Sequence, residues 1–199
     1  MLWFERMWVG LTPEDPRYRP TVDGGLCLEF HSGVPLRMPE ETFSTPFPEP
    51  KDPAPGEMIR IVSRSVLVRD LDATLRLLST NLDWEPVGSV EFLPEEGVRR
   101  ARLGFALGHS ATVDLIQPTR WNCDAGRYLY TWGPGPYSIQ IAVNGLEAKS
   151  EDLKARGTGF SWVPDGTVAE GRRLRVDPRD LDGTLIEFTA WEPATASVG

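Results

Sequence analysis

The stretch IRIVSRSVLVRDLDATLRLLSTNLDW, residues 59–84, decides the fold because it joins a strand pattern to a helix pattern. Residues 59–68 are rich in β-branched side chains, which favours a strand. Asp70 then provides an N-cap for a helix. Leucines recur at helical spacing after this cap, at Leu71, Leu75, Leu78 and Leu82. The stretch therefore predicts a strand followed directly by a helix.

Three more strand patterns follow this helix and complete a first module. They are VGSVEFL (87–93), VRRARLGFAL (98–107) and SATVDLIQP (110–118). Within the second of them, the apolar residues Ala101, Leu103, Phe105 and Leu107 stand at alternate positions, as on one face of a strand. Residues 58–118 are thus predicted to form one βαβββ module.

The same order of patterns begins again at YSIQIAV, residues 137–143. Asn144 and Glu147 have the spacing of a capping box for a second helix, and Gly157 supplies its stop. Three strand patterns then follow, GFSWVP (159–164), GRRLRVDP (171–178) and GTLIEFTAW (183–191). We therefore predict an α+β fold with two tandem βαβββ modules, at 58–118 and 137–191.

The N-terminal residues 1–43 look like part of a further module. The strand pattern G-x-x-L/I-E-F occurs at 25–30 as well as at 183–188. A Pro-rich linker at 44–57 separates this segment from the two-module domain at 58–199. Either Met1 is an internal Met of a longer four-module protein, or an N-terminal arm kept only two strands. A third interpretation is that any surface strand after a glycine turn has this pattern.

Strands of an incomplete module are expected to pair with an available sheet edge. That edge belongs either to the chain's own sheet or to a second copy of the chain. The second possibility makes a homodimer the expected assembly.

Composition and charge narrow the classes of partner and compartment. The chain has 199 residues, 40% of them hydrophobic and 25% charged, as is typical of a folded soluble protein. Its formal net charge of −8 argues against a nucleic-acid partner. The basic run at Arg99, Arg100 and Arg102 is interpreted as the solvated face of a strand. The opening MLWFERMWVG lacks a basic leader, so we expect a cytoplasmic protein without a membrane partner.

The tandem modules resemble the vicinal oxygen chelate (VOC) superfamily. The resemblance is carried by the helix starts VRDLDATLRLL (68–78) and VNGLEAKSEDLKARG (143–157) and by the closing strand GTLIEF (183–188). Glyoxalase I, methylmalonyl-CoA epimerase, extradiol dioxygenases and bleomycin-resistance proteins belong to this superfamily. The resemblance covers about residues 58–191 and implies a glyoxalase-like curled sheet around one cavity.

The resemblance also implies four metal-ligand positions, on the first and last strand of each module. They fall on Ser63, Asp114, Ser138 and Glu187. Serine stands where two histidines are expected, and a hydroxyl is a weak ligand beside an imidazole. We therefore predict no metal centre and no cofactor. The alternative is a weakly bound divalent cation, such as Mg²⁺ or Ca²⁺, at Asp114 and Glu187.

The other metal-type side chains lie outside these four positions. His31 and His109 are interpreted as exposed or structurally bonded. Cys27 and Cys123 have no zinc-type spacing and are expected to be free thiols, buried or half-buried.

Asp114 and Glu187 are the candidate catalytic residues. Two carboxylates that face one cavity could do acid/base chemistry without a metal, and they could also bind a cationic ligand. Alternatively, Glu187 is a remnant of the superfamily pattern, hydrogen-bonded to Ser63 or Ser138. Ser63, Ser138 and Gln140 are the candidate ligand-binding donors, because alternation places them on the same faces as the carboxylates.

The connector at 118–137 is rich in aromatic residues. Trp121, Trp132 and Tyr137 are therefore candidates for the wall of an organic-ligand pocket. A packed contact between modules or between subunits is the alternative.

These observations favour a small-molecule-binding protein of the VOC superfamily without the metal centre, with an organic ligand in an aromatic-lined cavity. The second hypothesis is a lyase, isomerase or epimerase with Asp114 or Glu187 as general base. The third is a structural or docking module. Glyoxalase I and extradiol dioxygenase activities are disfavoured because they require the metal.

Overall fold

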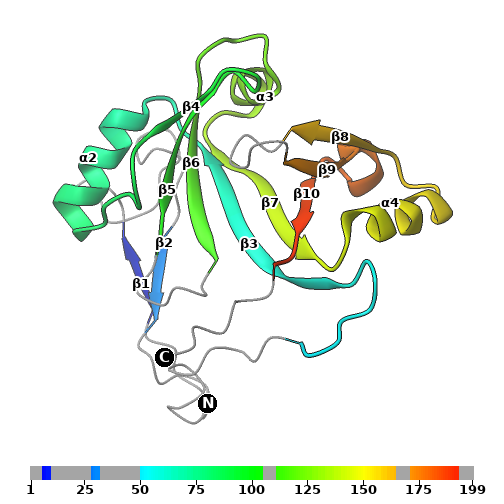
Figure 1. Cartoon of the computed structure of the whole chain (residues 1–199). Coiled ribbons are helices and arrows are strands. Elements are labelled where there is room, and N and C mark those ends of the chain that lie inside the picture. Colours follow the sequence, from blue (N-terminus) through cyan, green and yellow to red (C-terminus); the bar gives the residue numbers. More distant parts are fainter. Residues whose placement is uncertain (1–5, 10–27, 32–49, 105–110, 165–170, 193–199) are drawn as a thin grey trace. The chain divides into compact units, whose positions relative to one another are not determined.

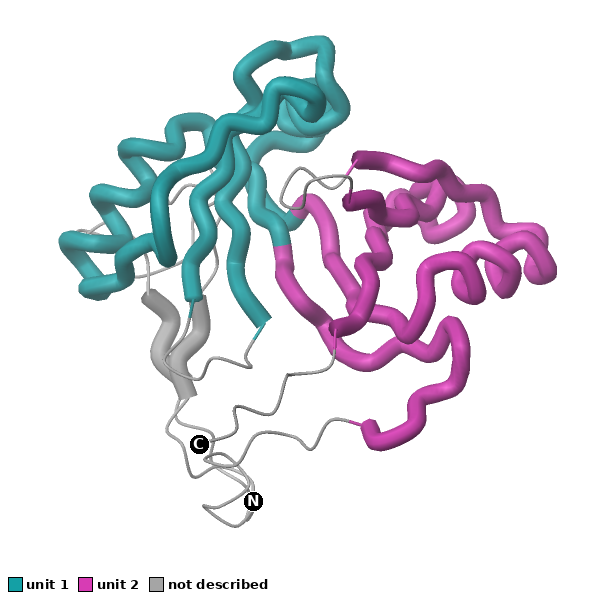
Figure 2. The backbone as a smooth tube through the Cα atoms, in the orientation of Figure 1, with its two compact units in different colours: residues 1–47, 65–136 teal, residues 48–64, 137–199 magenta. Residues whose placement is uncertain are grey.

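The computed structural model describes residues 6–9, 28–31, 50–104, 111–164 and 171–192. The chain divides into two compact units, each built from two segments (Figure 2). The first unit comprises residues 1–47 and 65–136, and the second comprises residues 48–64 and 137–199. Strand β3 (Met58–Leu67) contributes residues to both units.

In the first unit, a long helix packs on an antiparallel ladder (Figure 1). Its elements after β3 are α2 (Leu71–Leu82), β4 (Glu91–Leu93), β5 (Val98–Leu103), β6 (Thr112–Pro118) and α3 (Asp124–Trp132). β5 pairs with β4 on one side and with β6 on the other. The leucines of α2 pack against this ladder, with Leu71 and Leu78 fully buried beside Leu103 and Leu115.

Asp70 caps α2 as predicted, and its side chain accepts a hydrogen bond from the backbone N–H of Ala73 at 2.9 Å. The substitution Asp70→Ala is expected to reduce the free energy of unfolding by about 1 kcal/mol, because the N–H loses its acceptor. Asp70→Asn is the control, since its amide oxygen can replace the carboxylate. Urea denaturation measures both, and equal losses in the two variants would contradict a capping role.

The second unit repeats this arrangement around another core. Its elements are β7 (Gly135–Val143), α4 (Leu146–Ala155), β8 (Phe160–Pro164), β9 (Arg172–Val176), the 3₁₀ helix η1 (Pro178–Leu181) and β10 (Leu185–Ala190). β10 lies between β7, to which it is parallel, and β9, to which it is antiparallel. Leu146 and Leu153 of α4 pack with Leu174 and Phe188 of the sheet.

The α+β class and the two βαβββ modules are therefore confirmed. The predicted capping box at α4 is wrong. Gly145 occupies the N-cap position with φ of +87°, and no side chain caps the helix. The Asn144 amide instead donates to the backbone oxygen of Pro53 at 2.6 Å. Helix α4 ends at Ala155, shortly before Gly157, in agreement with the predicted stop.

The N-terminal segment supplies two short strands, β1 (Arg6–Val9) and β2 (Leu28–His31). They form an antiparallel pair, and no other described strand joins it. The interpretation of residues 1–43 as a partial module and the domain boundaries at 44–57 stay predictions, as does the homodimer. None of the helices in the described ranges is both long and apolar enough to span a membrane.

Candidate functional site

The face of β9 and β10 opposite the core carries charged side chains. Glu187 lies directly across from Arg175, and Phe188 lies across from Leu174. Because side chains alternate along a strand, Leu174 and Phe188 enter the core while Arg173, Arg175 and Glu187 share the other face.

The buried carboxylate of Glu187 is held by two guanidinium groups. Arg173 Nη1 donates to Glu187 Oε2 at 2.9 Å, and Arg175 Nε donates to Oε1 at 2.8 Å. Gln140, opposite Glu187 on β7, donates from Nε2 to Oε2 at 3.2 Å. Arg173 is 4% exposed and Arg175 is 19% exposed, as a fraction of the side chain. We name Arg173, Arg175, Glu187 and Gln140 the Glu187 cluster.

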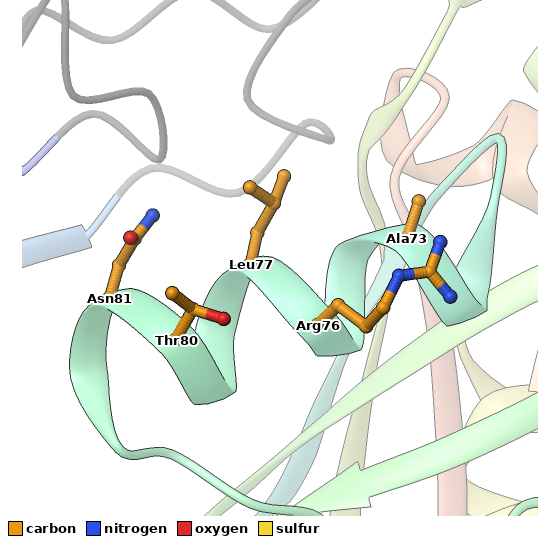
Figure 3. A pocket seen from close by; sticks show the side chains of 5 residues that line it. All are labelled: Ala73, Arg76, Leu77, Thr80 and Asn81. Carbon is orange, nitrogen blue, oxygen red and sulfur yellow. The ribbon is translucent and has the colours of Figure 1, made fainter.

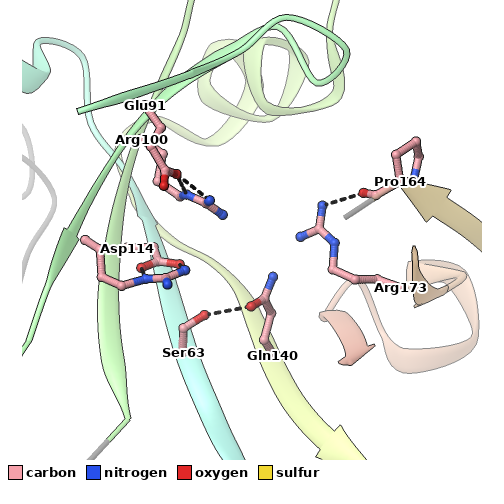
Figure 4. A network of polar contacts seen from close by, with 8 residues as sticks. Ser63, Glu91, Arg100, Asp114, Gln140, Pro164 and Arg173 are labelled. Atoms are coloured by element: carbon pink, nitrogen blue, oxygen red, sulfur yellow. Dashed lines mark hydrogen bonds and ion pairs between the residues drawn. The ribbon is translucent and has the colours of Figure 1, made fainter. Parts of the chain in front are cut away.

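Ser63 extends this cluster through Gln140. Its buried hydroxyl donates to Gln140 Oε1 at 3.1 Å (Figure 4). On the other side, Arg173 Nη2 donates to the backbone oxygen of Pro164 at 3.1 Å, which fixes the guanidinium plane. Ser138 is also buried, on β7 opposite Leu185. The predicted bond from Glu187 to Ser63 or Ser138 is thus replaced by bonds to Gln140 and the two arginines.

The first unit has a related but simpler arrangement. Arg102 on β5 lies opposite Asp114 on β6 and contacts both of its carboxylate oxygens, at 3.0 and 3.3 Å. Asp114 is buried, whereas the Arg102 side chain is 38% exposed. Arg100 donates to Glu91 of β4 at 2.9 Å (Figure 4). In this unit, each of the two carboxylates pairs with a different arginine.

The interpretation of Arg99, Arg100 and Arg102 as a solvated face is wrong for Arg100, which is buried. The sequence contained a pattern that could have predicted the ion pairs between these arginines and the carboxylates. The pattern R-R-x-R occurs at 99–102 and again at 172–175, each time on the strand before the last strand of a module. This repetition, rather than the single run, identifies arginines aligned with the carboxylates.

Comparison with solved structures identifies similar folds. A methylmalonyl-CoA epimerase from Mycobacterium tuberculosis has a TM-score of 0.62 at 23% identity, and the match covers 72% of this chain and 95% of that chain. A variant of the Streptomyces coelicolor methylmalonyl-CoA epimerase, in complex with 2-nitronate-propionyl-CoA, has a TM-score of 0.60 at 26% identity. That match covers 71% of this chain and 99% of the other. The chain has the vicinal oxygen chelate fold. No family model matches the sequence, and no curated protein matches it.

The VOC fold raises the question of a divalent metal at Ser63, Asp114, Ser138 and Glu187. Both oxygens of Glu187 accept hydrogen bonds from guanidinium groups, and Asp114 is paired with Arg102. Each carboxylate therefore faces a positive charge at close range, which opposes a second cation. Two serine hydroxyls cannot compensate for this. The described residues contain no group of three or more metal-type side chains. This donor set does not fit the metal of the VOC superfamily.

Two of the aromatic candidates, Trp121 and Trp132, lie beside and on a helix that the sequence patterns did not predict, and Tyr137 lies on β7. The connector contains α3, whose N-cap is the buried thiol of Cys123. Trp121 is 80% exposed and Trp132 is 74% exposed, whereas Tyr137 is half-buried. Their role as a pocket wall stays a prediction.

One hollow in the first unit lies along α2, with a volume of about 470 Å³ (Figure 3). Its lining residues are Ala73, Arg76, Leu77, Thr80 and Asn81. None of the predicted site residues lines it. Cys27 and His109 lie outside the described residues, and the side chain of His31 is not described.

Proposed function

We propose that this protein binds a small organic molecule and does so without a divalent metal ion. The observation that carries the proposal is the set of hydrogen bonds that the Glu187 carboxylate accepts. Its two oxygens are already bonded to Arg173, Arg175 and Gln140, so the residue organises a polar site and does not present free ligands to a metal. Similar structures with the VOC fold support a ligand-binding role. One of them is a complex with 2-nitronate-propionyl-CoA, and another is a complex with methylmalonyl-CoA.

An epimerase-type reaction is the second candidate, because several of the similar structures are methylmalonyl-CoA epimerases at 25–26% identity. In that case Asp114 or Glu187 would remove a proton from the carbon beside a carbonyl group. Such a base needs an oxygen that can approach the C–H group. The bonds at both oxygens of Glu187 disfavour this role and favour binding without turnover.

Metal independence is tested by ligand-induced changes in the melting temperature. The probes are methylmalonyl-CoA and a panel of small organic acids, amides and amines, each measured before and after dialysis against EDTA. We expect at least one probe to raise the melting temperature equally in both conditions, because no metal takes part in binding. A rise that disappears with EDTA and returns with Mg²⁺ or Zn²⁺ would contradict the proposal.

Turnover is tested separately in D₂O with methylmalonyl-CoA. A base that removes and returns the proton at C2 would exchange it for deuterium, which mass spectrometry detects. We expect no incorporation above the protein-free rate. Incorporation that is lost in the Glu187→Gln variant would favour the epimerase instead.

A further inference from the structure

We propose that Arg173 and Arg175 supply the positive charge that the VOC resemblance assigns to a metal, and that the ligand therefore carries a carboxylate or a comparable oxygen anion. This inference rests on the proposed function and adds the chemical class of the ligand. It reverses the expectation that two carboxylates bind a cation.

The first argument is the composition of the Glu187 cluster. Two guanidinium groups share one carboxylate, and the third partner, Gln140, is neutral. Guanidinium groups match the planar geometry of carboxylates and remain charged at every accessible pH. The site that the superfamily pattern reserves for an acidic residue and a metal is thus a cationic site in this chain.

The second argument is preorganisation. Arg173 is bonded at one end to Glu187 and at the other to the backbone oxygen of Pro164, and it is almost fully buried. A charge fixed in a poorly solvated site interacts more strongly with a ligand than a mobile surface charge does. Arg175 retains 19% exposure, so it is the member of the pair that a ligand can reach from solvent.

The first unit provides an internal comparison. Its Asp114 has one arginine, Arg102, and that side chain is twice as exposed as Arg175. One carboxylate with one partly exposed arginine makes a single ion pair in which the two charges offset each other. Glu187 instead accepts from two arginines, and one of them, Arg173, also donates to a backbone oxygen. The anion site is therefore assigned to the second unit.

The experiment compares charged and neutral forms of one small probe on the purified chain of 199 residues. Malonate and malonamide are titrated by isothermal calorimetry into the wild type and into Arg175→Gln, Arg175→Lys and Arg172→Gln. Arg172 is the matched control, because it lies on the same strand but pairs with Glu147 and stacks on Trp162 at 4.1 Å. Circular dichroism verifies that each variant is folded.

We expect malonate to bind and malonamide to bind at least tenfold more weakly, because only malonate can accept charge-assisted hydrogen bonds. Arg175→Gln should weaken malonate binding by about tenfold or more, Arg175→Lys should retain part of it, and Arg172→Gln should leave it unchanged. Added NaCl should weaken the binding of malonate and should not affect the binding of malonamide, which carries no charge.

Two outcomes overturn the inference and are distinguishable from each other. If malonamide or another neutral probe binds as well as malonate, or if Arg175→Gln binds malonate like the wild type, the arginines are structural and the proposed binding function stands. If neither charged nor neutral probes bind the metal-free protein, the inference and the proposed function both fail.

Discussion

The Glu187→Ala variant is expected to lose about 3–5 kcal/mol of the free energy of unfolding. Glu187 is buried and pairs with Arg173, which is 4% exposed, and with Arg175, which is 19% exposed. Its removal leaves two guanidinium charges close together in a poorly solvated place, without the group that offsets them. A loss of this size is a large part of the stability of a single domain. Urea denaturation followed by circular dichroism measures it.

The control for this prediction is Glu147→Ala. Glu147 also pairs with an arginine of β9, Arg172, but both side chains are exposed. An exposed ion pair contributes between 0 and about 1 kcal/mol, so this variant should stay close to the wild type. If both variants lose the same free energy, burial of the Glu187 cluster does not determine its contribution.

The second large effect is expected on the core face of β9, opposite to the face of that strand that carries Arg173 and Arg175. Leu174 has no exposed surface and packs with Leu146, Leu153 and Phe188. Leu174→Ala should reduce the free energy of unfolding by about 2–5 kcal/mol, because it removes buried methyl groups and leaves a cavity between α4 and the sheet. The midpoint of urea denaturation should fall while the dependence on urea concentration stays the same.

Leu174→Met serves as the matched variant, because it nearly conserves volume and should lose less than about 1.5 kcal/mol. Ligand binding should survive in both variants under conditions in which they are folded, since Leu174 points away from Arg173 and Arg175. A Leu174→Ala protein with wild-type stability would show that this core is loosely packed.

The sequence was least informative where one segment has to meet a distant one. The capping box at Asn144 and Glu147 had the correct spacing, yet the Asn144 amide bonds to Pro53, 91 residues away. Likewise, the connector was recognised by its aromatic residues, but α3 begins at the unexpected N-cap Cys123. Local patterns compete with tertiary contacts at such positions, and only the folded chain shows which contact prevails.

The α+β class and the order of the βαβββ strands and helices within the two modules were determined by the sequence alone. Period-two alternation, leucine spacing and the Asp70 cap are properties of neighbouring residues, so they can be read without knowledge of the rest of the chain. The same alternation placed Gln140 on one face with Ser138, and Glu187 on one face with Leu185. It could not show what each side chain would bind.

The partners of the site residues were decided by tertiary structure. Antiparallel register sets Arg175 opposite Glu187 across 12 residues of chain, and parallel register sets Gln140 opposite Glu187 across 47. Register depends on how whole strands pair, and a shift by one residue would turn every side chain to the other face. Two positions that resemble metal ligands in the sequence are therefore ion-paired carboxylates in the fold, and the charge of the site follows from the pairing of strands.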